Sequence, residues 1–292
     1  MRFTVSQSVW IKHTDCDIVI YGKKCPYSRK VEKMKILALG DIVSPGAVEG
    51  LKTKLWNYRK SEKIDFVVAN GENASRGNGL EADAAQALLD YGVDVITGGN
   101  HIWQKNSLRP FLESSKNIVR PMNFSGECAG NGYTIADCNG YRVLIMNVSG
   151  TVYMESLDCP FRSVEKCLES QKGKYDISLL DIHAEATGEK YALARYFDGR
   201  ISGIFGTHTH VQTADEQILP QGTAYITDLG MCGPKNSILG VKSEIIIEKM
   251  RTKMPARFEF AEGDIEYNGV IIEFDTSENR EIKSKIIKRV RF

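Results

Sequence analysis

Short apolar segments alternate along the chain with segments whose apolar residues recur every three or four positions. The short segments are rich in Val and Ile, which is typical of strands buried on both faces of a sheet. Alternation of such strands with helices predicts a layered α/β fold in which helices cover the sheets. The predicted strands are Lys35–Leu39, Ile64–Ala69, Val93–Thr97, Arg142–Val148, Asp176–Asp181, Ile201–Phe205 and Thr223–Thr227.

Apolar residues at helical spacing indicate three helices between these strands. Gly92 follows the second group in the position of a helix-ending glycine. The residues that mark the helices are Val48, Leu51 and Leu55, then Ala84, Ala87, Leu88 and Tyr91, and finally Val164, Cys167 and Leu168.

The last part of the chain has a different pattern. Arg257–Ala261, Ile265–Phe274 and Ile282–Val290 read as strands, joined by short segments rich in turn residues. Turns this close together predict antiparallel hairpins that complete a second sheet. No repeat, low-complexity tract or linker interrupts the chain after Met34, so we predict a single domain over residues 34–292.

Residues 1–33 do not share the pattern of the rest. They contain no apolar core of about 7–15 residues, so they are not a secretory signal. At Met34 the sequence changes to Met34-Lys35-Ile36-Leu37, which resembles the natural start of a domain. The segment is either a true N-terminal extension or the product of a gene model that begins too early. We favour the second interpretation and assign no function to these residues.

Polar residues gather where the predicted strands end. In open α/β sheets, ligands bind beyond the carboxyl ends of strands, so we expect five such ends to converge in one crevice. The segments in question are Asp41, Asn70-Gly71-Glu72-Asn73, Gly98-Gly99-Asn100-His101, Asp181-Ile182-His183-Ala184-Glu185 and Gly206-Thr207-His208-Thr209-His210.

Four of the five histidines in the chain lie in these segments, together with acidic and amide side chains. Such a set of oxygen and nitrogen ligands suits borderline metals such as Fe, Mn or Zn. The candidates outnumber the three or four protein ligands of one catalytic ion, which favours a two-metal site over a polar network that only caps the sheet. The candidates are Asp41, Glu72, Asn73, Asn100, His101, His183, His208 and His210.

Composition narrows the classes of partner and compartment. In 292 residues, 38 Lys and Arg stand against 37 Asp and Glu, and the net charge of +1 gives no electrostatic signature for DNA or an anionic membrane. No apolar run approaches the ~18 residues of a membrane span. Seven cysteines without a C-x-x-C pair indicate reduced thiols, and hence a cytoplasmic protein.

Three blocks resemble the signature of calcineurin-like metallophosphoesterases, in which the usual order is DxH, GDxxD, GNH, H and GxHxH. They are Gly99-Asn100-His101, the isolated His183 and Gly206-Thr207-His208-Thr209-His210. The chain departs from the signature in two places: Val43 stands where DxH has its His, and Asn70-Gly71-Glu72-Asn73 replaces GDxxD.

At these two places the sequence resembles one branch of the superfamily, the YmdB-like 2′,3′-cyclic-nucleotide 2′-phosphodiesterases. Three longer segments also resemble that branch: His183–Lys190, Gly206–Thr213 and Gly222–Met231. The resemblance extends from about Met34 to the C-terminus.

This resemblance implies a four-layer αββα sandwich, whose second sheet the C-terminal strands would complete, with two metal ions at one edge of the sheets. It implies that Glu72 bridges the ions and that His101, next to a ligand, is the general acid. Glu in place of the usual bridging Asp adds one methylene and leaves the distance between the ions open. By position, the first ion would take Asp41, Glu72, Asn73 and His210, and the second Glu72, Asn100, His183 and His208.

The expected cofactors are two divalent or mixed-valence ions, with Fe or Mn favoured over Zn. Two cations would make a bridging hydroxide available near neutral pH and would neutralise the phosphoryl oxygens, while His101 protonates the leaving oxygen. The resemblance implies a small-molecule substrate, a 2′,3′-cyclic nucleotide that opens to a 3′-nucleotide. The alternatives are an RNA-directed phosphodiesterase, a post-transcriptional regulator of the same fold or a non-catalytic scaffold. A homo-oligomer is left open.

Substrate contacts are not assigned by the sequence. Three basic residues near the motifs could contact a phosphate or simply be solvated charges: Arg76, Arg120 and Lys190. Three aromatic residues could stack on a base, although core packing is favoured for them: Tyr133, Tyr153 and Phe161.

Overall fold

The structure is a computed structural model that describes residues 19–20, 23–24, 33–276 and 282–292. The chain divides into two units, Met1–Lys30 and Val31–Phe292. In the first unit, β1 (Val19–Ile20) pairs antiparallel with β2 (Lys23–Lys24). The proposed N-terminal extension of residues 1–33 otherwise lies outside the described residues, as does His13, except that Lys33 begins β3 (Lys33–Val43). All elements below belong to the second unit.

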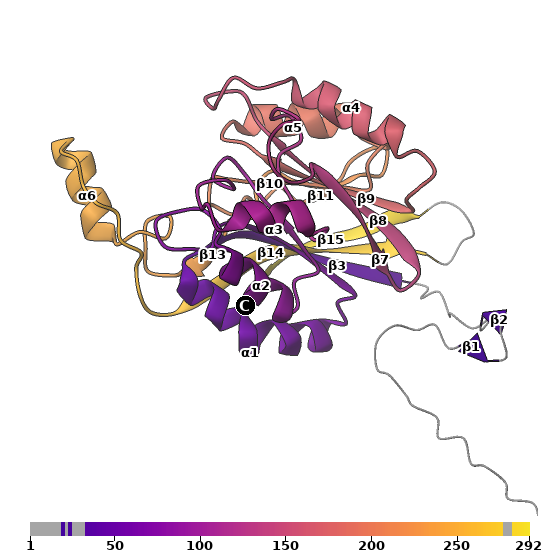
Figure 1. Ribbon diagram of the computed structural model, residues 1–292, viewed down its shortest axis with the longest axis horizontal. Helices are drawn as coiled ribbons and strands as arrows, with labels where there is room; N and C mark the ends of the chain where they lie inside the picture. The colour runs from indigo at the N-terminus through magenta and orange to yellow at the C-terminus, as the bar shows by residue number, and fades with distance from the viewer. Residues whose placement is uncertain (1–18, 21–22, 25–32, 277–281) are drawn as a thin grey trace, which may run out of the picture. The chain divides into compact units, whose positions relative to one another are not determined.

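Two sheets form the centre of the second unit (Figure 1). The first has seven strands in the order β15-β14-β13-β3-β4-β5-β6, and the second has six in the order β11-β12-β10-β9-β8-β7. The strands of the first sheet are β3 (Lys33–Val43), β4 (Phe66–Asn73), β5 (Val95–Thr97), β6 (Ile118–Val119), β13 (Met231–Pro234), β14 (Ile265–Asp275) and β15 (Lys283–Arg291). Those of the second are β7 (Tyr133–Cys138), β8 (Tyr141–Ser149), β9 (Ile177–His183), β10 (Gly203–Thr207), β11 (Gln217–Ile218) and β12 (Ala224–Ile226).

Helices cover the outer face of each sheet. Against the first sheet lie α1 (Pro45–Glu62), α2 (Ala82–Asp90) and α3 (Leu108–Ser114). Against the second lie α4 (Pro160–Ser170) and α5 (Thr187–Tyr196), while α6 (Ser243–Thr252) stands apart from the sheets (Figure 1).

Three hydrophobic cores separate the four layers. Alternate residues of β3 enter two of them: Leu37 packs toward α1, and Ile36 packs between the sheets. Because both faces of the strand are buried, its sequence is continuously apolar rather than alternating. The third core packs Val164 of α4 and Leu193 of α5 against the second sheet. The αββα sandwich implied by the sequence is therefore confirmed.

All seven strands predicted from apolar runs are present, with bounds shifted by a few residues, and the three predicted helices are α1, α2 and α4. The C-terminal part needs correction. Arg257–Ala261 is not a strand, since only Phe260 forms a single bridge, to Val241. The expected hairpin of β14 and β15 exists, but it joins β3 in the seven-stranded sheet and not the six-stranded sheet of β7–β12. Register with β3 decides this, because β14 pairs with β3 continuously from Lys33 to Leu39.

The direction of the strands places the polar strand ends close together. In the first sheet β3, β4 and β5 are mutually parallel, and in the second β8, β9 and β10 are parallel. The carboxyl ends within each sheet therefore meet at one edge. Among the described residues, no helix combines the length and the apolar character that crossing a bilayer requires.

Candidate metal centre

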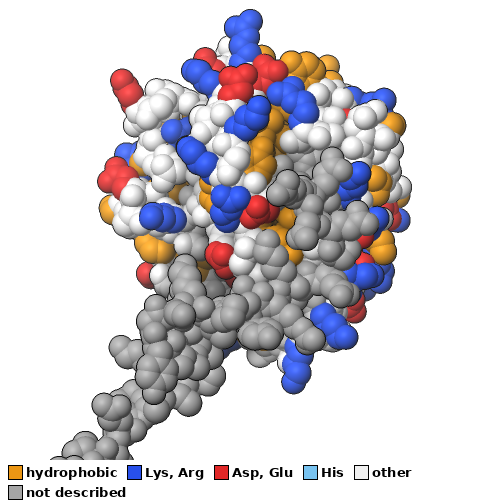
Figure 2. All heavy atoms as spheres, turned by 90° about the vertical axis from the view of Figure 1, so that its right-hand side faces the viewer, with side chains coloured by type: hydrophobic (Ala, Val, Ile, Leu, Met, Phe, Trp, Pro, Cys, Tyr) orange, Lys and Arg blue, Asp and Glu red, His pale blue; other side chains and the backbone are white. Residues whose placement is uncertain are grey.

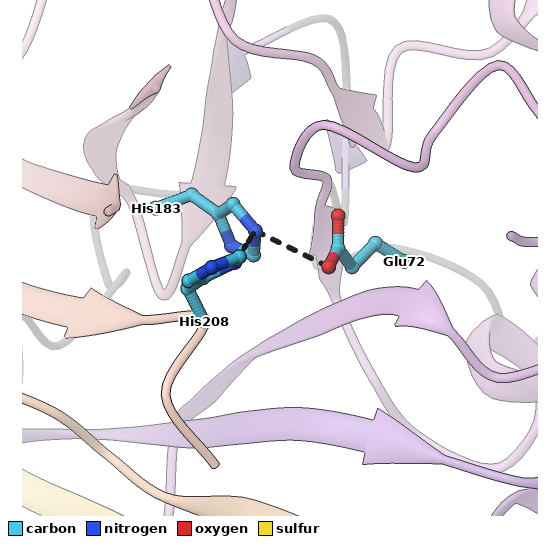
Figure 3. Close-up of side chains that lie close together, drawn as sticks. All are labelled: Glu72, His183 and His208. Atoms are coloured by element: carbon cyan, nitrogen blue, oxygen red, sulfur yellow. Dashed lines mark hydrogen bonds and ion pairs between the residues drawn. The ribbon is translucent and has the colours of Figure 1, made fainter. Parts of the chain in front are cut away.

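Three side chains from both sheets meet at the carboxyl ends of the strands. Glu72 comes from β4, His183 is the last residue of β9, and His208 follows β10 directly. Figure 3 shows the three side chains pointing toward one another. Nε2 of His183 lies 3.2 Å from Oε1 of Glu72 and 3.0 Å from Nδ1 of His208. One ligand atom from each lies within 4.8 Å of the other two, so the group could hold a metal ion.

A second group lies beside the first. Nε2 of His210 is 3.8 Å from Oδ1 of Asp41 and 3.4 Å from Nδ2 of Asn73, whose amide also donates to Oε1 of Glu72 at 3.0 Å. Rotating the Asn73 amide would exchange its oxygen and nitrogen without moving any other atom. Glu72 therefore stands between the two groups, where a bridging ligand is expected.

Asp41 shows that the residues present fit a cation. Its side chain is fully buried, and among the described residues its Oδ1 atom has no hydrogen-bond donor. A buried carboxylate oxygen without a partner is costly unless it is neutralised. An ion held with His210 would satisfy it, and carboxylate, amide and imidazole ligands suit borderline divalent metals.

The loop after β5 supplies the remaining candidates. Oδ1 of Asn100 lies 3.1 Å from Nε2 of His183, which places it with Glu72, His183 and His208. The backbone N–H of His101 donates to Oε2 of Glu72 at 3.0 Å. The imidazole of His101 is partly exposed, and its Nδ1 contacts the side-chain amide of Gln104.

Gly99 makes this arrangement sterically feasible. A Cβ at position 99 would lie 2.2 Å from Oε2 of Glu72 and 2.5 Å from Nε2 of His183. Both distances are far below van der Waals contact, so any side chain would displace the two groups. The glycine is needed for close approach of the loop, and not for an unusual backbone angle.

The loop that carries His208 and His210 has strained backbone geometry. His208 has φ 98° and His210 has φ 63°, in the left-handed region that side chains other than glycine rarely adopt. Such conformations cost about 1–3 kcal/mol each and persist only where surrounding contacts impose them. One such contact is the hydrogen bond from the His208 N–H to Oδ2 of Asp41 at 3.1 Å.

Buried polar residues behind His183 orient its ring. Nδ1 of His183 lies 2.9 Å from Oγ1 of Thr207, which in turn donates to Oδ1 of Asp181 at 2.7 Å. Asn70 donates to Oδ2 of Asp181 at 3.3 Å. With Nδ1 engaged in this way, Nε2 is presented to Glu72 and Asn100. Asp181 and Thr207 are not among the residues nominated from the sequence. Alternation along a strand could have indicated Asp181, because positions 181 and 183 share one face.

The charges of the cluster depend on one another. Burial alone would raise the pKa of Glu72, but His183 and His101 together outweigh burial and lower it to about 2. Burial disfavours charge on His183, yet Glu72 and Asp41 raise the pKa of this ring to about 9. Burial raises the pKa of Asp41, and burial together with His183 lowers that of His208 to about 3. The carboxylates of Glu72 and Asp41 thus require positive charge close by.

The residues considered for substrate contact have different surroundings. Lys190 is fully buried and ion-paired, and Arg120 is buried with its guanidinium donating to backbone carbonyls such as that of Pro121. Neither is a solvated charge or an accessible phosphate ligand. Arg76 is exposed, and Tyr153 is 89% exposed, so core packing was the wrong expectation for Tyr153.

All eight residues nominated from the sequence therefore lie at one edge of the sandwich. Seven of them are connected by contacts between side chains, and the eighth, His101, is joined to Glu72 through its backbone. The arrangement combines carboxylate, amide and imidazole groups in a buried site with one partly exposed imidazole at its margin.

Comparison with known proteins identifies chains of similar sequence and fold. A protein of Bacillus subtilis named 2′,3′-cyclic-nucleotide 2′-phosphodiesterase is 41% identical over 250 residues, which cover 86% of this chain and 95% of that protein. A crystal structure of a hypothetical protein from Thermus thermophilus superposes with a TM-score of 0.82 at 36% identity, covering 89% of this chain and 99% of the other.

A second crystal structure, of a Mycoplasma pneumoniae protein described as a novel phosphatase, has a TM-score of 0.81 at 33% identity. It matches 89% of this chain and 93% of its own. The family model described as "YmdB-like protein" matches residues 37–288, which include every residue of the candidate metal centre. The chain belongs to the YmdB-like protein family.

Proposed function

We propose that the protein is a metal-dependent phosphodiesterase that hydrolyses 2′,3′-cyclic nucleotides to 3′-nucleotides. The observation that carries the proposal is the convergence of Glu72, His183 and His208 beside a buried Asp41 oxygen to which no group in the described part of the chain donates. The 41% identity to a protein with that named activity supports the substrate class.

We propose two ions, Fe or Mn in preference to Zn. Asp41, Asn73 and His210 would hold one, Asn100, His183 and His208 the other, and Glu72 would contact both. Bound cations would supply an activated water and would neutralise charge on the phosphoryl oxygens. Two groups of ligand atoms with Glu72 between them support a dinuclear site.

The chain's own contribution to bond cleavage would come from His101. A departing alkoxide is a poor leaving group and needs a proton, and an imidazole is the side chain that most often supplies one as a general acid. The contact between Nδ1 and Gln104 orients the ring, which leaves Nε2 to deliver the proton. The backbone bond to Glu72 keeps this donor next to the ligands.

An RNA-directed activity has less support. Affinity for a polyanion depends on grouped Lys and Arg, whereas the net charge is +1 and Figure 2 shows Lys and Arg interspersed with Asp and Glu on the face it presents. A small substrate, whose single phosphate two cations would neutralise, matches this surface better.

The decisive experiment is identification of the product. The purified protein, loaded with Mn²⁺ or Fe²⁺, is incubated with 2′,3′-cyclic AMP, and chromatography separates 2′-AMP from 3′-AMP, with a chelated sample as control. Metal-dependent 3′-AMP is the expected result. Release of 2′-AMP would contradict the assignment of the cleaved ester. No nucleotide product from protein shown to contain two ions would overturn the substrate class and favour RNA.

A further inference from the structure

A fully buried ion pair lies behind the loop that carries His208 and His210. Nζ of Lys190, on α5, donates to Oδ2 of Asp228 at 2.6 Å, and both side chains are completely buried. Asp228 lies between β12 and β13, so the pair joins a helix to the segment that links the two sheets. Removing two charges from water costs free energy, which the attraction between Lys190 and Asp228 has to offset.

Asp228 connects this pair to the backbone beneath the candidate ligands. Its Oδ2 also accepts the N–H of Thr209 at 3.2 Å, and Thr209 separates His208 from His210. Its Oδ1 accepts the N–H of Gly230 at 2.8 Å. The carbonyl of Gly230 then accepts the N–H of Asp41 at 3.1 Å. One carboxylate is thus within two hydrogen bonds of three candidate ligands.

The aliphatic part of Lys190 packs against the strand that precedes the loop. A Cβ at Gly206 would lie 2.7 Å from Cδ of Lys190 and 1.9 Å from the carbonyl oxygen of Thr227. The glycine that opens the Gly206-Thr207-His208-Thr209-His210 block is therefore required because the buried lysine and the Thr227 carbonyl approach the backbone so closely. Close packing therefore explains why this position of the motif is glycine, although glycine has no side chain that could contact a metal.

We propose that Lys190 and Asp228 are positioning residues that hold Asp41, His208 and His210 in the geometry that binds metal. The proposal rests on the proposed metal centre. Successive N–H groups of the loop are held by two carboxylates, that of His208 by Asp41 and that of Thr209 by Asp228. These bonds hold His208, which has a positive φ, and Thr209, which precedes His210, the other residue of the loop with a positive φ. Lys190 places its ammonium group against the buried Asp228 carboxylate, which also accepts the two backbone N–H groups.

The test compares metal affinity in Asp228→Asn with that in the native full-length protein. The amide keeps the size of the side chain and one acceptor, but it cannot accept from Lys190, Thr209 and Gly230 together. We expect Mn²⁺ affinity, measured by competition with a fluorescent chelator, to fall about 10–100-fold, as when groups behind metal ligands are lost. Lys190→Met should weaken Mn²⁺ binding in the same direction.

Asp94→Asn is the matched control. Asp94 also pairs with a cation, Arg59 at 3.0 Å, and accepts a backbone N–H, that of Val67 at 2.7 Å. It precedes β5, at the end of the strand opposite to Asn100 and His101. Asp94→Asn should lower thermal stability and leave Mn²⁺ affinity unchanged.

The outcomes separate this inference from the proposed function. If the native protein binds no divalent metal, the proposed function fails. If the native protein binds Mn²⁺ and folded Asp228→Asn binds it equally well, only the positioning role is overturned. If Lys190→Met does not fold, Asp228→Asn alone decides the question.

Discussion

The Nε2 atom of His183 lies 3.2 Å from Oε1 of Glu72, although the two residues belong to different sheets. His183 ends β9 in the six-stranded sheet, and Glu72 lies near the end of β4 in the seven-stranded sheet. Neither sheet alone presents the site. Its chemistry therefore depends on groups held by both halves of the sandwich, and the predictions below use that dependence.

Metal binding should stabilise the fold. At a free concentration of 100 times its Kd, an ion that binds only the folded protein adds about 2.7 kcal/mol to the free energy of unfolding. For a domain of this size, the Tm should then rise by about 5–10 °C. Differential scanning fluorimetry with Mn²⁺ and with chelator measures the shift. An unchanged Tm across a wide range of Mn²⁺ concentration would contradict a site built from Glu72, His183 and His208.

His210→Ala should reduce the metal content from two ions to one. His210 lies beside Asp41 and Asn73, while the group of Glu72, His183 and His208 keeps its contacts without it. Elemental analysis of the purified variant measures the stoichiometry. Retention of two ions would show that His210 is not a ligand.

His101→Ala should separate substrates by leaving group. Activity toward 2′,3′-cyclic nucleotides should fall by about 10²–10⁴-fold, since the alkoxide that leaves needs a proton. A nitrophenyl phosphodiester should lose much less, because nitrophenolate leaves without one. Equal losses in kcat on the two substrates would contradict the role of general acid.

Gly99→Ala should damage the site without a change of charge. The added methyl would displace Glu72 and His183, and misplacement of about 1 Å costs roughly 10²-fold in rate. Gly126→Ala is the control, because a Cβ there meets nothing within 4 Å. Comparable kcat in the two variants would show that the crowding at position 99 is relieved without functional cost.

The cysteines should differ in reactivity. Cys138, Cys167 and Cys232 are buried, and burial raises the pKa of the Cys138 and Cys167 thiols to about 12. Cys159 is exposed and should react with a maleimide before the other cysteines that the structure describes. Peptide mapping by mass spectrometry resolves each position, which matters because Cys16 and Cys25 lie outside the described residues. Rapid labelling of Cys232 in the folded protein would contradict the packing of β13.

Much of the fold could be predicted because local sequence and burial agree. β3, β4 and β9 are apolar on both faces, so their strands were recognisable from composition alone. The destination of the C-terminal hairpin was not, because pairing with β3 is a contact between distant residues and leaves no local mark. Phe260 similarly sits in an apolar stretch that forms only one bridge.

The candidate ligands were predictable because polar residues at strand ends stand out against apolar runs. Asp181 and Asp228 were harder to recognise. A buried aspartate behind a ligand has the same local sequence as one that turns the chain, and only the packing shows that Lys190 and Thr209 converge on Asp228. Lys190 illustrates the limit, since a basic residue near a motif gives no sign of whether it reaches solvent.

The arrangement of ligands on two sheets gives the inner hydrophobic core a second role. Val68 of β4 and Leu179 of β9 both pack in that core, on the strands that carry Glu72 and His183. Facing sheets are held about 10 Å apart by the volume of the side chains between them. The thickness of this hydrocarbon layer therefore helps to set the separation of the candidate ligands, and core residues that never touch the candidate metal centre should influence its geometry.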